Sequence, residues 1–470
     1  AQSNFNHVEL DSIPSDLPLP KITTLTTPSD GYIFAAVPYW GNGAKYLVVY
    51  DNSGRPVFNR KTEATCTDFK MQDNGLLTYY DYAAQKFFAM DSTLGVVDSF
   101  WVQNGFITDE HDLKILPNGN VLLIGYAVKF FDMRQYVQGG DPNASVIVNV
   151  IQEIDRNKNV VFDWKSADHY KITDAGSSVN LLDPAFVHAH INSVCVDLDG
   201  HLVISARNLD EITKIDRKNG NIVWRMGGKN NQFRFVNDSI GFSAQHAVST
   251  LPNGNVLMYD NGLFHQPPFS RAVEYRLDTV KKTAERVWSY RNTPDIASEI
   301  WGNAQRLMNG NTFISWGNSS IAATEVTAGG EKVFEMTFPK DVFSYRVFRF
   351  PFKKKNIVSA FNDVNTTSAF TLNQNFPNPF SAGGGSAYGG NSSTTITYTL
   401  PSRSRVRLEI FNLLGQRITA LVESEQSGGS HSVVWNASVT SGVYICRLET
   451  TALDNPTKRF LQFQKLMLVR

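Results

Sequence analysis

"HDLKILPNGNVLLIGY", residues 111–126, consists of an apolar stretch, a tight turn and a second apolar stretch. The Asn-Gly pair that ends at Gly119 is typical of a β-hairpin, because glycine readily adopts the positive φ that such a turn requires. The same organisation recurs in "NSVCVDLDGHLVISAR" at 192–207 and in "HAVSTLPNGNVLMYDN" at 246–261. Three related hairpins spaced along one chain predict a repeat protein.

Weaker copies of this hairpin extend the repeat in both directions. They are "TTLTTPSDGYIFAAV" at 23–37, "TDFKMQDNGLLTYYDY" at 67–82 and "GNAQRLMNGNTFISWG" at 302–317. The turn glycines are Gly31, Gly75, Gly119, Gly200, Gly254 and Gly310, and the long interval after Gly119 indicates an insertion. A second hairpin follows most copies, as in "VIQEIDRNKNVVFDW" at 150–164, "ITKIDRKNGNIVWRM" at 212–226 and "ATEVTAGGEKVFEMTF" at 323–338. Two hairpins make a four-stranded antiparallel sheet, so the sequence predicts an all-β fold with a six-bladed β-propeller over residues 21–352.

The rest of the chain has a different character. An N-terminal arm is expected at 1–20, and the polar residues 353–370 are typical of a linker. Short alternating strands then follow, including "TTITYTLP" at 394–401 and "HSVVWNA" at 431–437. We therefore expect a small C-terminal β-sandwich over residues 371–470.

Composition narrows the classes of partner. Lys plus Arg and Asp plus Glu both number 44, so the charge balance does not favour nucleic acid as the main partner. No apolar run is long enough for a transmembrane helix. The sequence begins at Ala1, which favours a mature protein whose signal peptide has been removed. A homo-oligomer remains open.

The repeat also predicts where polar side chains converge, because the first strand of each blade lines the propeller axis. Eight residues before the turn glycines stand Thr67, His111, Asn192 and His246. His190 shares a strand face with Asn192, and Asn303 lies near the same level in the last repeat. Arg207 follows its turn glycine by seven residues, so the hairpin folds it back beside Asn192. His188 is expected just behind this set.

Two other interpretations of these residues are open. A single strand histidine is most often a hydrogen-bonded structural residue, and three histidines together can hold zinc. Convergence through independent repeats argues against the first interpretation. Arg207 argues against the second, since a guanidinium favours an anionic ligand over a cation. We therefore expect neither a metal nor another cofactor.

"EHDL" at 110–113, "HINS" at 190–193, "VISARN" at 203–208 and "QHAV" at 245–248 resemble elements of the bacterial aryl sulfotransferases that use an aryl sulfate as donor. The resemblance spans most of residues 21–350. It implies that His246 accepts the sulfuryl group transiently and that His111, His190 and Arg207 are catalytic. It implies a substrate-binding role for Asn192, and we add His188, Asn303 and Thr67 as substrate-binding candidates.

The C-terminal segment resembles the sorting domain of type IX secretion substrates. The matching stretches are "NQNFPNPF" at 373–380, "IFNLLGQ" at 410–416, "SGVYICRLE" at 441–449 and "QKLMLVR" at 464–470. The resemblance implies recognition by the type IX secretion machinery. It also implies that the protein is secreted or attached to the outer-membrane surface.

The resemblance to the aryl sulfotransferases therefore implies a transferase that moves a sulfuryl group from a phenolic sulfate ester to a phenolic acceptor. A histidine nucleophile divides this transfer into two steps, which gives ping-pong kinetics. Two other classes remain open. One is a non-catalytic extracellular propeller that serves as a surface, adhesion or filament subunit. The other is a quinone-cofactor propeller, which lacks support from a calcium-ligand set in the sequence.

Overall fold

The computed structural model describes residues 13–38, 43–350, 370–372, 375, 378, 380–381, 393–412, 415–453 and 459–469. The chain divides into two compact units, Ala1–Ile357 and Val358–Arg470. Residues 1–12 of the predicted arm and the predicted linker, apart from Phe370, lie outside the described residues. The described residues are almost entirely β-structure. Four short helices occur among them, all in the first unit: η1 (Met133–Gln135), α1 (Ser166–His169), η2 (Ile172–Asp174) and η3 (Arg207–Leu209). None of the described helices is long and apolar enough to cross a membrane.

The described part of the first unit forms six sheets of four or five strands. The first three, each given from its inner to its outer strand, are as follows. One contains β27 (Val347–Phe350), β2 (Tyr32–Val37), β3 (Lys45–Tyr50) and β4 (Pro56–Thr62). The next contains β5 (Cys66–Met71), β6 (Leu77–Asp81), β7 (Lys86–Met90) and β8 (Val96–Phe100). The third contains β9 (Ile107–Ile115), β10 (Val121–Phe131), β11 (Ala144–Ile154) and β12 (Val160–Lys165), with β13 (Ala185–Val187) parallel to the start of β11.

The other three sheets follow the same order along the chain. The fourth contains β14 (Ile191–Val196), β15 (Leu202–Ala206), β16 (Glu211–Ile215) and β17 (Ile222–Gly227). The fifth contains β19 (His246–Thr250), β20 (Val256–Asp260), β21 (Arg271–Asp278), β22 (Thr283–Tyr290) and, at its outer edge, β18 (Arg234–Val236). The sixth contains β23 (Asn303–Arg306), β24 (Thr312–Ser315), β25 (Ile321–Val326), β26 (Lys332–Thr337) and, at its outer edge, β1 (Lys21–Leu25).

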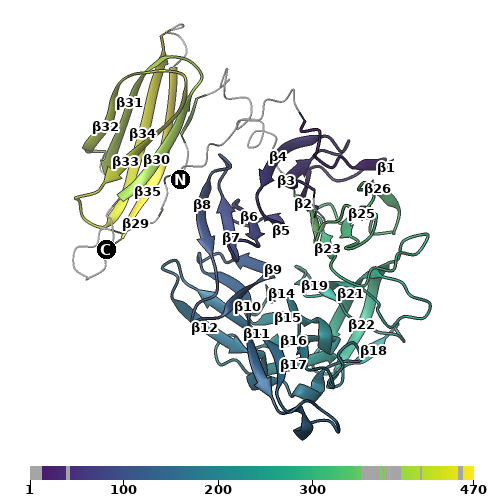
Figure 1. The fold of residues 1–470 in the computed structure, drawn as a ribbon. Coiled ribbons are helices and arrows are strands. Elements are labelled where there is room, and N and C mark those ends of the chain that lie inside the picture. Colours follow the sequence, from purple (N-terminus) through teal and green to yellow (C-terminus); the bar gives the residue numbers. More distant parts are fainter. Residues whose placement is uncertain are drawn as a thin grey trace. The chain divides into compact units, whose positions relative to one another are not determined.

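The inner strands of these sheets form a closed cycle. Contacts run from β27 to β5, β9, β14, β19 and β23, and from β23 back to β27. The sheets accordingly surround a common centre in a propeller-like arrangement (Figure 1). Side chains that the inner strands direct toward this centre come from distant parts of the sequence and can meet there.

The hairpin turns have the geometry that their glycines require. Gly119, Gly200 and Gly254 have φ values of 85°, 84° and 81°, in the left-handed region that glycine adopts without steric cost. Each turn joins the inner strand of a sheet to the next strand outward, as β14 and β15 show. The repeated turn therefore fixes where these inner strands end.

The predicted hairpin at 23–37 is wrong. β1 pairs with β26 in the sixth sheet, whereas β2 pairs with β27 and β3 in the first. The physical reason is burial. All six residues of β2 are buried, so this strand needs a partner on both sides, whereas β1 alternates between exposed and half-buried residues as an outer strand does. The inner strand of the first sheet comes instead from Val347–Phe350, which closes the cycle.

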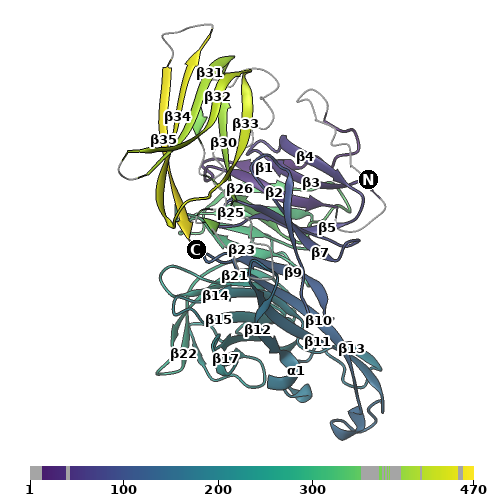
Figure 2. The same cartoon turned by 90° about the vertical axis from the view of Figure 1, so that its left-hand side faces the viewer.

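The long interval after Gly119 is an extension of the third sheet. β10 and β11 pair over eleven residues each, and this pairing continues beyond Tyr126, which lies opposite Ile107 at the start of β9. The segment that follows β12 carries α1 and η2 and returns through β13 to the start of β11 (Figure 2). The extension of the third sheet has a small hydrophobic core of its own, which contains Met133, Ala144, Val146, Val148 and Ile172.

The second unit contains two sheets of its own. One contains β28 (Thr371–Leu372), β30 (Ser393–Leu400) and β33 (Gly429–Asn436). The other contains β29 (Phe380–Ser381), β35 (Arg459–Val469), β34 (Gly442–Ala452), β31 (Ser404–Asn412) and β32 (Arg417–Gln426). Both sheets contribute to a single hydrophobic cluster that includes Ile396, Tyr398, Trp435, Leu408 and Leu448. The unit therefore has a core independent of the first.

Candidate functional site

Four of the inner strands carry an irregularity at the same level. The register shifts between Thr67 and Lys70 in β5, between Ile191 and Ser193 in β14, and between His246 and Ser249 in β19. In β9 the shift lies opposite the segment Leu123–Gly125, which places His111 within it. Bulges change the direction of side chains and are common beside active sites.

Three of the predicted histidines lie together at this level. The Nε2 atoms of His190 and His111 are 3.2 Å apart, and the centroids of the two rings are separated by 4.9 Å. The ring of His246 lies 6.4 Å from that of His190, so the order is His111, His190, His246. The three side chains come from β9, from the residue before β14 and from β19, so the arrangement depends on three neighbouring sheets.

The hydrogen bonds of His246 define its tautomer. Its Nδ1 atom lies 2.7 Å from Oδ1 of Asn261 and 3.1 Å from the carbonyl oxygen of Ala244. Asn261 uses its Nδ2 group to donate to the carbonyls of Ser298 and Trp301, which leaves its Oδ1 as the acceptor. Since both partners of Nδ1 accept, Nδ1 carries the proton and Nε2 retains its lone pair.

The two neighbouring histidines differ in charge. Burial alone would lower the pKa of His111, but the carboxylates of Asp109 and Glu110 outweigh it and raise this pKa to about 9. His111 Nδ1 contacts Asp109 Oδ1, so its Nε2–H points to His190. Burial, followed by the charges of His111 and Arg207, holds the pKa of His190 well below its usual range. A cationic His111 therefore donates to a neutral His190 at neutral pH.

His246 is also held neutral. It is almost completely buried, and burial is the main reason that its pKa lies well below the usual histidine range. The charge of Arg207 and the other two histidines lower this pKa further. The result is an unprotonated Nε2 at neutral pH, which is the state that a nitrogen nucleophile needs.

Arg207 opens η3, directly after β15. Its backbone N–H donates to the carbonyl of His190 at 3.0 Å, and its guanidinium donates to Asn208 Oδ1 at 2.9 Å and to the carbonyl of Glu299 at 3.1 Å. Its Nε atom is buried and has no hydrogen-bond partner within the described chain. A fixed guanidinium with an unused donor suits an anionic ligand.

The four other predicted residues lie at the same centre or just outside it. Asn192 is fully buried, and its amide donates to the carbonyl of Gln245 at 2.8 Å. Thr67 is fully buried with its hydroxyl on the carbonyl of Glu110 at 3.4 Å. Asn303 is buried, and both polar atoms of its side chain lack a partner among the described residues. His188 is directed elsewhere, with Nε2 at 3.1 Å from the carbonyl of Lys171.

Among the described residues, one group of side chains could hold a metal ion. Ligand atoms of Asp109, Glu110 and His111 all lie within 4.8 Å of one another. The Nδ1 atom of His111 already contacts Asp109, and the cationic state of His111 opposes a metal bond to its ring. The unused donor of Arg207 instead favours an anion.

Sequence reasoning missed several residues of this centre. Asn261 stands seven residues after Gly254, the same spacing that identified Arg207 after Gly200. Asp109 lies two residues before His111 in an extended strand. This spacing predicts that the two side chains share a face, so Asp109 could also have been identified. Tyr345, whose ring lies 5.5 Å from that of His111 and whose buried hydroxyl has no described partner, precedes β27 and belongs to no repeat.

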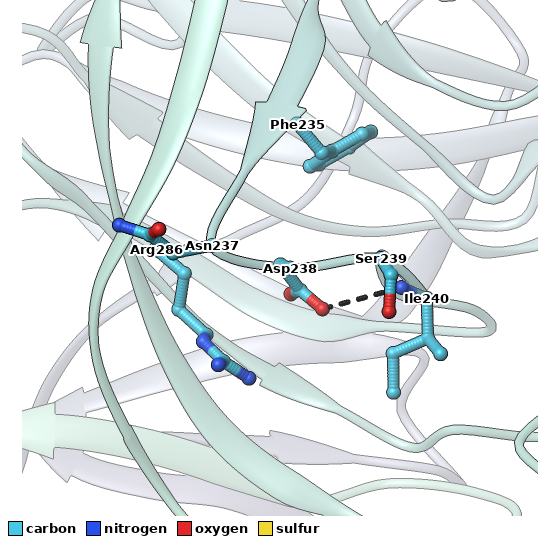
Figure 3. A pocket seen from close by; sticks show the side chains of 6 residues that line it. All are labelled: Phe235, Asn237, Asp238, Ser239, Ile240 and Arg286. Atoms are coloured by element: carbon cyan, nitrogen blue, oxygen red, sulfur yellow. Dashed lines mark hydrogen bonds between the residues drawn. The ribbon is translucent and has the colours of Figure 1, made fainter.

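A separate hollow of about 410 Å³ lies on the outer part of the fifth sheet. Phe235, Arg286 and the segment from Asn237 to Ile240 line it, and Ile240 N donates to Asp238 Oδ1 (Figure 3). The carboxylate of Asp238 also binds Arg271 and Tyr275, which anchors the chain that leads to His246. None of the three clustered histidines lines this hollow.

Fold and centre together define a propeller-like β-protein with a buried centre of histidine and arginine side chains. The Arylsulfotransferase (ASST) family model matches residues 27–349. The chain belongs to this family, which confirms the sulfotransferase resemblance at the level of the family. No curated protein matches.

Solved structures with a similar outline include a protein of unknown function from Bacteroides caccae. It is 12% identical, with a TM-score of 0.45, and the match covers 68% of this chain and 99% of that one. A virginiamycin B lyase from Staphylococcus aureus is 9% identical, with a TM-score of 0.38 and coverage of 68% and 88%. The hydrazine synthase of Kuenenia stuttgartiensis is 12% identical, with a TM-score of 0.37 and coverage of 70% and 80%. These scores are too low to carry a functional argument.

Proposed function

We propose that this protein is an aryl-sulfate sulfotransferase that moves a sulfuryl group from a phenolic sulfate ester to a phenolic acceptor. The observation that carries the proposal is the environment of His246. Two acceptors keep its proton on Nδ1, so the lone pair of Nε2 is free in a buried cationic centre. Membership of the arylsulfotransferase family supports the same reaction class.

In the first half of the reaction, His246 Nε2 attacks the sulfur of the donor. A bond forms between Nε2 and sulfur while the bond between sulfur and the aryl oxygen breaks, and the electron pair leaves on that oxygen. His111 holds a proton for this phenolate and can pass it through His190, because their Nε2 atoms are 3.2 Å apart. The second half reverses these events with the acceptor phenol.

Charge stabilisation falls to Arg207 and His111. Sulfuryl transfer resembles phosphoryl transfer, in which charge spreads over three peripheral oxygens in a loose transition state. The unused Nε donor of Arg207 is available for such oxygens, and the positive charge of His111 stabilises them electrostatically while its two N–H groups stay on Asp109 and His190. Asn303, with two unpartnered polar atoms, is a further substrate-binding candidate.

Purified protein incubated with a chromogenic aryl sulfate tests this function. We expect release of the coloured phenol to depend on an added phenolic acceptor, and double-reciprocal plots at several acceptor concentrations to be parallel. Release that is equally fast without acceptor would indicate a sulfatase. No release with a range of donors would favour a non-catalytic role.

The pH dependence of the first half-reaction should reflect His111. Because His111 acts when protonated, we expect the rate of phenol release in a single turnover to fall as pH rises through about 9. Asp109→Asn removes the nearest carboxylate that raises this pKa, so the basic limb should move to lower pH. Stopped-flow measurement of the burst at each pH checks this. If Asp109→Asn leaves the basic limb of the pH–rate profile unchanged, His111 is excluded as the proton donor.

We further propose that the six sheets are the blades of a six-bladed β-propeller and that the second unit is a β-sandwich that directs type IX secretion to the cell exterior. The closed cycle of inner strands supports the first statement, and the separate core of the second unit supports independent folding. In this proposal the second unit takes no part in catalysis, because the site residues, including His190, Arg207 and Asn192, belong to the first unit.

Truncation near residue 365 should therefore leave sulfotransferase activity intact and abolish export, because the described core of the second unit contains residues of that unit alone. Activity of the purified fragment and its distribution between cells and medium are the measurements. Loss of activity in a folded fragment would show that the second unit contributes to catalysis.

A further inference from the structure

A group of four buried charges lies among the inner strands. Lys70 in β5 contacts Asp68 at 2.6 Å and also Asp112 in β9. Arg346, which directly precedes β27, lies 3.3 Å from Asp68 and 3.6 Å from Asp112. Two cations and two anions balance one another, which is the condition under which buried charges are tolerated. This charge cluster joins the closing strand to two other sheets.

Arg346 also contacts a third sheet. Its Nη2 atom donates to the backbone carbonyl of Asn192 at 2.8 Å. Asn192 sits in the bulge of β14, where its carbonyl is free of the sheet ladder. Asp112, another member of the charge cluster, accepts from Val194 N at 3.2 Å and so fixes the same strand from the other side of the bulge.

Residues of the β14 bulge in turn bind the backbone on both sides of His246. The side chain of Asn192 donates to the carbonyl of Gln245 at 2.8 Å, and the hydroxyl of Ser193 accepts from Val248 N at 2.9 Å. The side chain of Gln245 is itself fixed by donating to the carbonyls of Glu211 and Ala206. The direction of His246 therefore depends on where the bulge of β14 lies.

From these contacts we infer that Arg346 is a positioning residue for His246, acting through Asn192 although it touches no reacting atom. Closure of the ring and alignment of the nucleophile are then one structural event. The inference rests on the proposed function for its kinetic consequence, while the placement of the His246 ring can be measured without any reaction.

Arg346→Lys keeps the charge that balances Asp68 and Asp112 but cannot span both the carboxylates and the Asn192 carbonyl. We expect a slower first half-reaction at saturating donor, by roughly tenfold to a hundredfold as for a small displacement of a reacting group, with little change in donor KM. Asn192→Ala should also slow this half-reaction, because Gln245 loses the amide that holds its carbonyl. The double variant should be no slower than the slower single variant, because both changes break one path.

Arg349→Lys is the matched control. Arg349 lies three residues after Arg346, within the closing strand β27. It is fully buried and pairs with Glu325 at 2.9 Å, but it contacts neither Asn192 nor the charge cluster. If Arg346 only stabilises the closed ring, both variants lose rate in proportion to their loss of thermal stability. A selective loss in the Arg346 variant supports positioning, and equal losses would overturn it.

Nitrogen-15 spectra of the histidine rings, recorded without substrate, give a second readout. The His246 signals are assigned by their loss in His246→Ala. We expect Arg346→Lys to change the Nδ1–H signal of His246 and Arg349→Lys to leave it in place. An unchanged signal in both variants would overturn the inference. If the wild-type protein transfers no sulfuryl group, the proposed function fails, but this comparison still decides whether Arg346 positions the ring.

Discussion

Replacement of His246 with alanine should abolish turnover and remove a covalent adduct that the wild-type protein forms with donor alone. The adduct is one sulfuryl group bonded to Nε2, since Nδ1 is occupied by its proton and by Asn261. The N–S bond is labile in acid, so the protein is kept neutral or alkaline before mass analysis. His111→Ala should slow transfer yet still allow some adduct, because His111 supplies a proton rather than the nucleophile.

His201→Ala is the control for this experiment. His201 lies in the turn after Gly200, outside the clustered histidines, and its loss should change neither adduct nor rate. Peptide mapping distinguishes the alternatives. A sulfuryl group on the peptide that carries His111 or His190 would contradict the assignment of His246. An acceptor-dependent reaction without any histidine adduct would indicate direct transfer between the substrates.

Replacement of Arg207 with lysine should reduce the rate by about a hundredfold to a thousandfold, the usual effect of losing one donor to transition-state charge. Lysine keeps the positive charge but cannot reproduce the planar donors that Arg207 directs to Asn208 and Glu299, nor its buried Nε donor, which has no partner among the described residues. Single-turnover measurement at saturating donor separates this effect from weaker binding.

Arg286→Lys provides the comparison for Arg207. Arg286 lines the outer hollow of the fifth sheet, away from the histidines, and its replacement should leave the rate unchanged (Figure 3). Activity of Arg207→Lys close to that of the wild type would mean that Arg207 contributes only charge. The cluster would then need another donor for the sulfuryl oxygens, for which Asn303 is the candidate.

The hairpin repeat predicted most of the sheet order because its signal is local. A glycine with positive φ and alternating apolar residues specify each hairpin without reference to distant segments. The closing strand could not be predicted in this way. β27 has only four residues and pairs with β2 across the whole unit, so nothing near Val347 identifies its partner. The same non-local pairing displaced β1 from the first sheet to the sixth.

The candidate centre was predictable where the repeat register applied. Counting from the turn glycines identified His111 and His246, and the structure places both rings beside that of His190. Asn261 obeys the same spacing as Arg207 and could have been found. Tyr345 and Arg346 lie in the connection to the closing strand. They belong to no repeated hairpin, so their positions could not be counted from a turn glycine. The position of Asn192 within a bulge, which turns its amide toward Gln245, also depends on tertiary pairing rather than on sequence pattern.

The pairing of Tyr32 with Phe350 has a consequence for biosynthesis. Until Val347–Phe350 has left the ribosome, one edge of β2 in the nascent chain is unpaired. All six residues of β2 are apolar. Such an edge invites pairing with other chains, so we expect translation products that stop before Val347 to aggregate rather than to accumulate as inactive monomers. The first unit would then become active only after Val347–Phe350 has been synthesised and has paired with β2.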